Sequence, residues 1–422
     1  MRVIIIHPGI QHSYRLANAL QYSNLFSKVY LLTSILYPIN KKPFLKSFDK
    51  RIKPIHPSIV IKNHLIYELL SKITRKIYNK LINNPNKQVH NNPIYFWQFI
   101  FALWCLPTIW WHRKNLVLVT YETAAWPISF FAKKWQIPVV MDFPSISHET
   151  AKELGINETN FGIAIKKRER KYIDYALFCS VFCRDSFVGL TSAKKDFVLY
   201  LGAEEIKNLK LKVESKVYQV LSIKYQDTNR GNEKDKIVKI SFIANLEYRK
   251  GLDILLDAIY SYQYPAFLEV HLIGKIRQDW VEKHMPETIL NNKVTLVYQH
   301  GMSQQELFTY LMKEQFDLNV QPSRFDSFAM VVPETMMQGI PNLVSPFVGA
   351  GEMLKNGVDG FVMSQLDSLS LAQSISSFAN LTADELINLK REVLKTVAQM
   401  TWENYSREVS KTFKKILKDL NK

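Results

Sequence analysis

The sequence predicts an α/β protein of two domains, each built on a doubly wound parallel β-sheet. Three observations predict this class. The chain has 422 residues, 47% of them hydrophobic, which is enough for two separate cores. Short apolar runs of β type alternate with helix-like stretches, as expected of parallel strands joined by helices. Carboxylates flank one strand–helix junction late in the chain, which is where α/β folds bind ligands.

The first half of the chain supplies one set of alternating elements. Its expected strands are Val3–Ile6, Val29–Leu32, Leu116–Val119 and Val139–Met141. Helix-like stretches between them include Ser13–Leu20 and Ala124–Lys134. The first apolar run is too short for a signal-peptide core and is followed at once by His7-Pro8-Gly9. It is therefore expected to be a buried strand.

A second set of elements follows a polar stretch at residues 226–236, which is expected to be a surface loop. The expected strands are Ile237–Ile243, Phe267–Ile273, Val294–Tyr298, Leu318–Val320 and Leu343–Val344. The expected helices are Leu252–Tyr260, Gln304–Lys313 and Val331–Gln338. The domain boundary is placed before the loop, with residues 1–205 in the first domain and residues 206–402 in the second. The last segment, Glu403–Leu420, is expected to be a basic amphipathic helix.

The formal net charge of +17 lies entirely in the first half. Residues 1–200 contain 28 Lys and Arg against 11 Asp and Glu, whereas residues 201–422 contain 27 of each. This asymmetry indicates an anionic partner for the first half: lipid headgroups, a phosphorylated acceptor or nucleic acid. No nucleic-acid partner is expected, because the sequence has no zinc-finger, helix-turn-helix or RNP-type signature.

Residues 41–114 interrupt the α/β pattern. Lys41–Lys87 is basic, whereas Tyr95–Trp111 is apolar and rich in tryptophan, with His112-Arg113-Lys114 directly after it. The segments fit either a solvated helix face beside an ordinary core helix, or a peripheral docking surface for an anionic membrane. Pro107 is expected to interrupt the apolar segment. No window reaches the ~20 uninterrupted apolar residues of a spanning helix.

Three cysteines, Cys105, Cys179 and Cys183, are too few for a disulfide framework and fit a reducing cytoplasm. Cys179 and Cys183 are expected to be buried core residues, because no His or Cys cluster accompanies them. A metal or redox pair is the alternative.

The stretch from Phe325 to Gly360 carries the strongest chemical pattern. Asp326 and Glu334 stand eight positions apart around an apolar segment, and the breaker Gly339-Ile340-Pro341 follows. Carboxylates at such a junction can accept hydrogen bonds from a ribose or hexose diol, and a helix N-terminus can hold a phosphate. The pattern predicts a sugar-nucleotide site. A helix cap or a solvated carboxylate is the alternative for each acid.

This stretch resembles glycosyltransferase family 4, the retaining transferases of GT-B fold. In that fold two Rossmann-like domains face each other and a C-terminal helix, here residues 403–422, crosses back to the first. Asp326-x7-Glu334 is similar to the family's paired acids, usually Glu-x7-Glu, and Pro322–Ala329 to its Pro-Ser-x-x-Glu-Ser-Phe-Gly context. Two positions depart: the first acid is Asp, and Ala329 replaces a glycine. The resemblance implies that Asp326 contacts the donor sugar and that Glu334 holds the ribose diol.

A second segment, Ala244–Gly251, resembles the family's Gly-Arg-Leu-x-x-x-Lys-Gly, whose two cations bind the diphosphate. Lys250 has the position of the lysine, where an ammonium offsets charge on the leaving diphosphate. A surface lysine is the alternative. Asn245 has the position of the arginine and carries no charge. Arg249 and Arg324 are the candidates for the missing cation, although neither has the matching position.

Two loops of the first half resemble cleft segments of the same family. His7–Ser13 follows the first strand, where the family has a glycine-rich loop, and holds one glycine, Gly9. Pro138–His148 is similar to the stretch that carries a cleft histidine near the transferred sugar. His148 is therefore the expected histidine, with His12 as the alternative, and each fits a structural role equally well.

The resemblance implies an enzyme that moves a sugar from a nucleotide-diphosphate sugar to a saccharide or lipid-linked acceptor, in polysaccharide or lipopolysaccharide synthesis. Its implied catalytic residues are His148, Lys250 and Asp326. Its implied donor-binding residues are Gly9, Asn245, Arg249, Lys250, Ser327, Phe328, Ala329 and Glu334.

No cofactor and no metal are expected, since the sequence has no Asp-x-Asp. The expected location is the cytoplasm, peripherally on the inner face of the membrane. The alternatives are another GT-B enzyme, such as a sugar-nucleotide epimerase or phosphorylase, or a non-catalytic nucleotide-sugar-binding relative.

Overall fold

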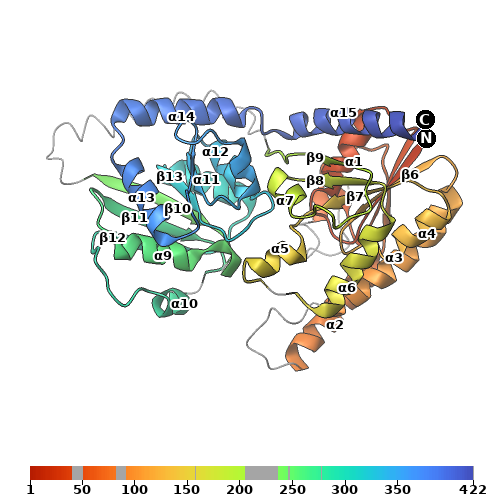
Figure 1. Cartoon of the computed structure of the whole chain (residues 1–422), viewed down its shortest axis with the longest axis horizontal. Helices are drawn as coiled ribbons and strands as arrows, with labels where there is room; N and C mark the ends of the chain where they lie inside the picture. The colour runs from red at the N-terminus through yellow and green to blue at the C-terminus, as the bar shows by residue number, and fades with distance from the viewer. Residues whose placement is uncertain are drawn as a thin grey trace. The chain divides into compact units, whose positions relative to one another are not determined.

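The computed structural model describes residues 1–39, 51–81, 92–156, 158–204, 236–245, 248–276 and 278–421. The chain divides into two compact units, Met1–Tyr200 with Glu403–Lys422, and Leu201–Trp402 (Figure 1). The first stretch of the first unit ends at Tyr200, whereas the sequence predicted a boundary after residue 205. The expected loop at residues 226–235 and the basic stretches 41–50 and 82–87 lie outside the described residues.

The first unit is built on a seven-stranded parallel sheet with the order β5-β2-β1-β6-β7-β8-β9. The strands are β1 (Arg2–His7), β2 (Lys28–Thr33), β5 (Val60–Asn63), β6 (Leu116–Tyr121), β7 (Val139–Phe143), β8 (Tyr175–Phe178) and β9 (Lys195–Val198). A separate small pair is formed by β3 (Tyr37–Pro38) and β4 (Ile52–Lys53). β6 and β7 are buried along their whole length, as expected where helices cover both faces of a parallel sheet.

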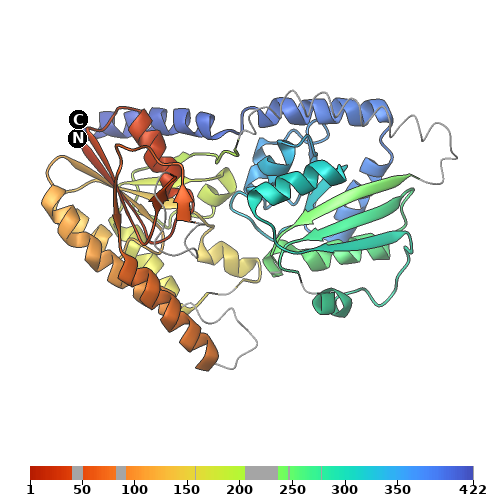
Figure 2. The same cartoon turned by 180° about the vertical axis from the view of Figure 1, so that it is seen from behind.

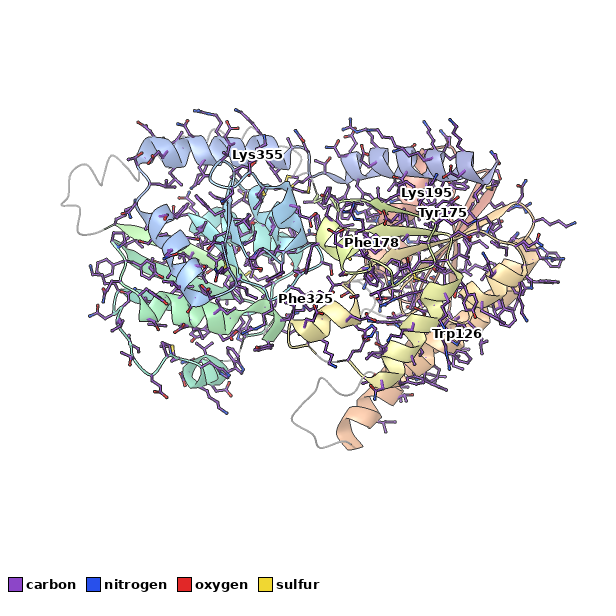
Figure 3. All side chains as sticks on the ribbon, in the orientation of Figure 1. Trp126, Tyr175, Phe178, Lys195, Phe325 and Lys355 are labelled. Carbon is purple, nitrogen blue, oxygen red and sulfur yellow. The ribbon has the colours of Figure 1, made fainter. Side chains whose placement is uncertain are left out.

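The helices of this unit are α1 (Ser13–Tyr22), α2 (Leu65–Leu81), α3 (Asn92–His112), α4 (Ile128–Lys134), α5 (His148–Glu153), α6 (Asn160–Glu169), α7 (Val181–Asp185) and α15 (Trp402–Leu420). α15 returns to the first unit from residue 403 on. The Phe413 ring packs edge-on against Phe26, with 6.0 Å between the ring centroids. Lys195 of β9, labelled in Figure 3, forms an ion pair with Asp419 at the end of α15.

α4 begins at Ile128 and not at the expected Ala124. The buried carboxylate of Glu169 accepts hydrogen bonds from the backbone N–H groups of Thr123, Ala125 and Trp126, at 2.7–2.9 Å. These bonds replace those of a helical turn, so the residues before Ile128 form a loop.

α3 continues through Pro107, so the expected interruption at that residue is wrong. Among the described residues one stretch, Ile94–His112 in α3, is long and apolar enough to cross a membrane, by length and composition alone. α3 also contacts β1, α4 and α6. One of its faces therefore belongs to the core of the first unit.

The second unit is built on a six-stranded parallel sheet with the order β12-β11-β10-β13-β14-β15. The strands are β10 (Ile237–Ile243), β11 (Phe267–Ile273), β12 (Val294–Gln299), β13 (Leu318–Gln321), β14 (Asn342–Val344) and β15 (Phe361–Val362). The helices are α9 (Leu252–Ser261), α10 (Gln278–Lys283), α11 (Gln304–Glu314), α12 (Val331–Met336), α13 (Ser368–Ala379) and α14 (Ala383–Val397), with 3-10 turns η5 (Tyr248–Lys250) and η6 (Gly349–Met353). The five expected strands and three expected helices of this unit are confirmed, with small differences at their ends.

Candidate functional site

The strand order of the second unit reverses between β10 and β13, and ligands of α/β sheets bind beyond the carboxyl ends of such strands. The loops that leave β10 and β13 lie against each other there. The backbone N–H of Arg324 donates to the carbonyl of Arg249 at 2.8 Å. Gly251 has a φ of +69°, and a Cβ on it would lie 2.0 Å from the carbonyl oxygen of Pro322. Only glycine allows this close approach, which brings the two loops together.

Lys250 and Asp326 meet where these loops touch. The ammonium of Lys250 donates to Oδ2 of Asp326, and Nη1 of Arg249 lies 3.5 Å from the same oxygen. The other oxygen, Oδ1, accepts hydrogen bonds from the backbone N–H groups of Phe328 at 3.3 Å and Ala329 at 2.9 Å. Burial favours the neutral acid, but Lys250 and Arg249 outweigh it and lower the pKa of Asp326. The site thus holds an ionised carboxylate beside two cations.

Of the two arginines that were candidates for the missing cation, Arg324 is already neutralised. Its guanidinium forms two hydrogen bonds with the carboxylate of Asp253, at 2.9 and 2.6 Å, and stacks 3.6 Å from the centroid of the Tyr248 ring. Arg249 directs its guanidinium at Asp326 instead. The geometry therefore favours Arg249 over Arg324 as the second cation of the site.

Glu334 lies in the first turn of α12, and its Oε1 accepts a hydrogen bond from Nε2 of Gln304 on α11, at 2.8 Å. Burial raises the pKa of Glu334 to about 7. Among the described residues no cation offsets the burial of this carboxylate, in contrast to Asp326. It is therefore the acid of the pair whose charge changes near neutral pH.

The side chains of Ser327, Phe328 and Ala329 are buried, so this loop offers mainly its backbone to a ligand. The carbonyls of Asp326 and Phe328 accept hydrogen bonds from the N–H groups of Gly349 and Ala350, at 2.9 and 2.7 Å. Ala329 has a φ of +67°, a conformation that favours the glycine usual at this position.

Two other predicted donor-binding residues form no hydrogen bond or ion pair with Lys250 or Asp326 among the described residues, and only one of them lies in the second unit. Asn245 is exposed, two residues after the end of β10. Gly9 belongs to the first unit, in the loop between β1 and α1. Its N–H donates to Nδ1 of His7 at 2.8 Å, and its carbonyl accepts from the Thr33 hydroxyl at 2.8 Å.

The strand order of the first unit reverses between β1 and β6, and a polar cluster lies at the carboxyl ends of these strands. Nε2 of His12 lies 2.8 Å from Oδ2 of Asp142, near the end of β7. The rings of His7 and His12 pack edge-on against Tyr121, at centroid distances of 4.6 and 5.4 Å. Burial lowers the pKa of His7 to about 4, so this imidazole is neutral at pH 7. The pair of His12 and Asp142 has the geometry of a carboxylate-oriented imidazole, which can bind or deprotonate a hydroxyl.

His148 is the first residue of α5. Its Nδ1 lies 2.8 Å from Oε2 of Glu149, without the angles of a hydrogen bond. The same glutamate oxygen lies 3.6 Å from Nη1 of Arg170. Burial lowers the pKa of His148. The two candidate histidines therefore differ: His12 is oriented by a carboxylate, whereas His148 is not hydrogen-bonded through Nδ1 among the described residues.

Asp142 and Gln304 contact candidate site residues although the sequence predicts no role for either. Asp142 directly follows the expected strand Val139–Met141, so its position alone placed it at the ligand-binding edge of a sheet. No sequence signal marked Gln304, because its partner Glu334 lies 30 positions later in the chain. Cys179 and Cys183 are buried free thiols, as expected.

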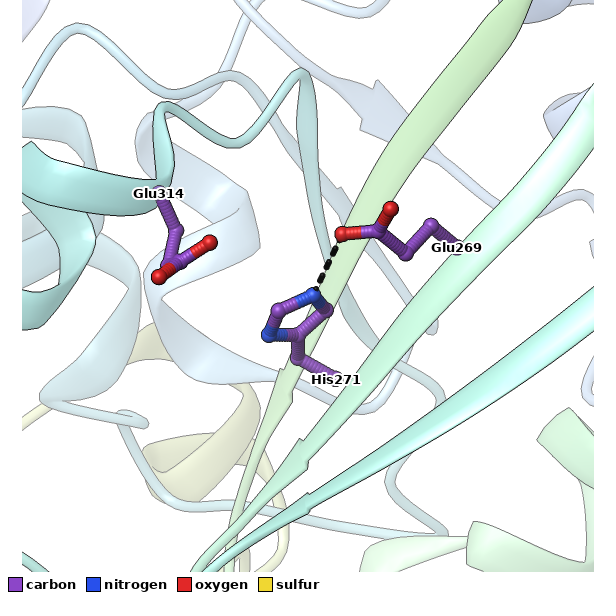
Figure 4. A group of neighbouring side chains, drawn as sticks. All are labelled: Glu269, His271 and Glu314. Carbon is purple, nitrogen blue, oxygen red and sulfur yellow. Dashed lines mark hydrogen bonds and ion pairs between the residues drawn. The ribbon is translucent and has the colours of Figure 1, made fainter.

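One further group of side chains in the described part of the chain could hold a metal by geometry: Glu269, His271 and Glu314 (Figure 4). A cation is already there, since Nζ of Lys239 lies 2.9 Å from Glu269 and 3.4 Å from Glu314. Lys239 and Glu269 are paired in the first halves of β10 and β11, away from the carboxyl ends. The group is therefore better explained as a structural ion-pair network.

Comparison with known proteins finds a match to one family model within the second unit. Residues 224–398 match the family model described as Glycosyl transferases group 1. The chain is 24% identical over 179 residues to an uncharacterized 41.2 kDa protein in the cps region of Klebsiella pneumoniae, covering 41% of this chain and 46% of that protein. It is 25% identical over 247 residues to an uncharacterized glycosyltransferase of Methanocaldococcus jannaschii, covering 56% of each. The chain thus spans about half the length of these relatives.

Solved structures establish the fold over nearly the whole chain. The crystal structure of Anabaena HepE in complex with UDP-glucose superposes with a TM-score of 0.59 at 16% identity, covering 98% of this chain and 100% of that one. The fold is GT-B, the class built from two Rossmann-like domains. The match to the Glycosyl transferases group 1 model lies within the second unit.

Proposed function

We propose that the protein is a retaining glycosyltransferase that moves a sugar from a nucleotide-diphosphate sugar to a saccharide or lipid-linked acceptor. The observation that carries the proposal is the meeting of Lys250, Arg249 and Asp326 at the strand-order reversal of the second unit. Cations there can bind a diphosphate, and an ionised carboxylate beside them can accept hydroxyl hydrogen bonds from the sugar. The relative in a cps region supports a role in cell-surface polysaccharide synthesis.

In this proposal the donor diphosphate replaces Asp326 as the ion-pair partner of Lys250 and Arg249. The N-terminal end of α9, which begins directly after Lys250 and Gly251, adds backbone N–H groups for the same anion. Glu334 accepts hydrogen bonds from both hydroxyls of the ribose diol. Lys250 offsets the negative charge that grows on the departing diphosphate, and no metal is needed for that purpose.

A nucleotide-sugar screen tests the proposal. Because a ligand that binds the native state raises its melting temperature, UDP-glucose or another nucleotide sugar is expected to stabilise the protein. Product analysis by NMR is then expected to show the donor's anomeric configuration retained, with activity unchanged by EDTA. Absence of stabilisation by every nucleotide sugar would refute donor binding. Conversion of the donor without acceptor would instead indicate an epimerase or phosphorylase.

We also propose that His12, oriented by Asp142, binds the acceptor hydroxyl that is glycosylated. His12→Ala is expected to lower the transfer rate by about 100-fold, the usual contribution of a positioned acid–base group. Affinity for UDP, measured by calorimetry, is expected to stay within a factor of two of wild type, since the change lies in the first unit. His148→Ala is the matched comparison. A larger loss of transfer in that variant than in His12→Ala would reassign the role to His148.

Donor affinity is expected to rise with pH across the pKa of Glu334. A diol donates to the ionised carboxylate best, and that form becomes dominant above about pH 7. The affinity for UDP, measured between pH 6 and pH 8, is expected to rise several-fold more in wild type than in Glu334→Gln, because ionisation of the terminal phosphate of UDP affects both proteins alike. Equal pH profiles for the two proteins would exclude Glu334 from ribose binding.

A further inference from the structure

Helix α2 carries an apolar stripe on its solvent side. Ile66, Leu69, Leu70, Ile73 and Ile77 follow the spacing of one helix face, and each is between 40% and 64% exposed. In a helix that packs on a core by its apolar face, these residues would be the buried ones. In α2 these apolar residues are instead exposed.

Buried polar contacts fix α2 in this orientation. Glu68 is 4% exposed, and its Oε1 lies 2.7 Å from Nη2 of Arg51 and 2.9 Å from Nζ of Lys72. Tyr67, also buried, packs its ring 5.1 Å from that of Phe101 on α3. The face of the helix that contains Tyr67 and Glu68 is therefore anchored inward, and the isoleucine face remains outward.

The neighbouring helix α3 adds a second exposed apolar stripe, and Figure 2 shows α2 and α3 side by side in the first unit. Phe96, Leu103 and Trp110 recur every seven residues on one side of α3 and are exposed, as is Trp111. The guanidinium of Arg113 lies 3.7 Å from the centroid of the Trp110 ring. We name the two stripes together the α2–α3 face.

The charge around this face is strongly positive. The described stretches that carry this face, residues 51–81 and 92–114, contain 9 Lys and Arg but only 1 acidic residue, Glu68. Lysine is depleted in protein–protein interfaces, whereas basic residues beside tryptophan are typical of the boundary between water and lipid. An anionic bilayer matches both the exposed apolar side chains and the charge.

We propose that the α2–α3 face docks the protein peripherally on the surface of an anionic lipid bilayer. The isoleucine and tryptophan side chains enter the interface, and the basic residues contact lipid phosphates. In the cell this corresponds to the inner, cytoplasmic face of a membrane, which brings the first unit to a lipid-linked or membrane-borne acceptor. The docking is independent of catalysis, so it can be tested without an identified acceptor.

Vesicle co-sedimentation of the full chain tests the proposal. The wild-type protein is expected to bind vesicles with about 30% phosphatidylglycerol and not pure phosphatidylcholine vesicles, because each basic residue near an anionic surface adds attraction. Binding is expected to weaken between about 50 mM and about 500 mM salt, as the Debye length shortens. Ile66→Glu/Ile73→Glu is expected to weaken binding at least about tenfold, because it places charge where apolar side chains enter lipid.

The matched control is Ile289→Glu/Leu290→Glu, which makes the same chemical change at two exposed apolar positions of the second unit, 52% and 54% exposed. It is expected to bind vesicles like wild type. Trp111→Glu, on the other helix, is expected to weaken binding, and unchanged melting temperatures show that the variants fold. Equal binding to both vesicle types, or full binding by both α2–α3 variants, would overturn the proposal. Concentration-dependent self-association that Ile66→Glu/Ile73→Glu abolishes would assign the face to a protein partner instead.

Discussion

Lys250→Ala is expected to reduce the turnover of a nucleotide sugar by about 100-fold to 1,000-fold, the cost typical of removing one preorganised group that stabilises charge in the transition state. The ammonium contacts Asp326 in the unliganded protein, so its position is fixed before the donor arrives. The affinity for UDP is expected to fall by about tenfold, because one charge-assisted contact to the diphosphate is lost. Steady-state kinetics with the donor found in the nucleotide-sugar screen, and calorimetry with UDP, measure the two effects.

Lys313→Ala is the control for Lys250→Ala, since that lysine lies on α11 of the same unit with a side chain 79% exposed. It is expected to leave both quantities unchanged. Lys250→Arg keeps the charge on a longer, planar group and is expected to recover part of the affinity and less of the turnover. If Lys250→Ala turned over the donor at the wild-type rate, Lys250 would not be the residue that stabilises the leaving diphosphate.

The fold could be predicted from the sequence because its signals are local. β1 contains the unbroken apolar run Val3–Ile6, and β10 and β11 are mostly apolar. The helices between the strands show the 3.6-residue period of apolar positions. The predicted structure was wrong where contacts with side chains distant in the sequence determine the local backbone conformation. Glu169 lies more than forty residues from the N–H groups that it holds before α4, and no local pattern reports such a contact. The orientation of α2 depends likewise on Arg51 and the buried Glu68.

The candidate site was predictable to the extent that its residues follow strand ends. Lys250 and Asp326 each follow a strand of the second unit, and the strand order then brings them together. The sequence could not show which arginine supplies the second cation, because the pairing of Arg324 with Asp253 depends on how the loop after β13 meets α9. For the same reason the structure was needed to show that Asp326 lies beside two cations, whereas Glu334 lies beside none in the part of the chain that the structure describes.

Arg170→Met is expected to destabilise the first unit by about 3–5 kcal/mol, the usual cost of leaving one member of a buried ion pair without its partner. Arg170 is 2% exposed, and its Nε and Nη2 donate to Oε1 of Glu122 at 3.0 and 2.7 Å. Glu122 follows the last residue of β6 and is also buried. Hydrogen exchange of peptides from β6 and β7 measures the loss, with β10 and β11 of the second unit as internal reference.

The double variant Glu122→Gln/Arg170→Met separates the ion pair from simple packing. If the cost comes from an uncompensated buried carboxylate, removing that charge should restore a large part of the stability lost in Arg170→Met. If the cost comes mainly from the contact of the guanidinium with the Phe187 ring, 4.6 Å from its centroid, the double variant should be no more stable than the single one. We expect the first result, because Lys166, with Nζ 3.7 Å from Oε2 of Glu122, is too distant for a direct hydrogen bond. The ion pair joins the end of β6 to the end of α6, so its loss should also loosen the edge of the sheet where His12 and Asp142 lie.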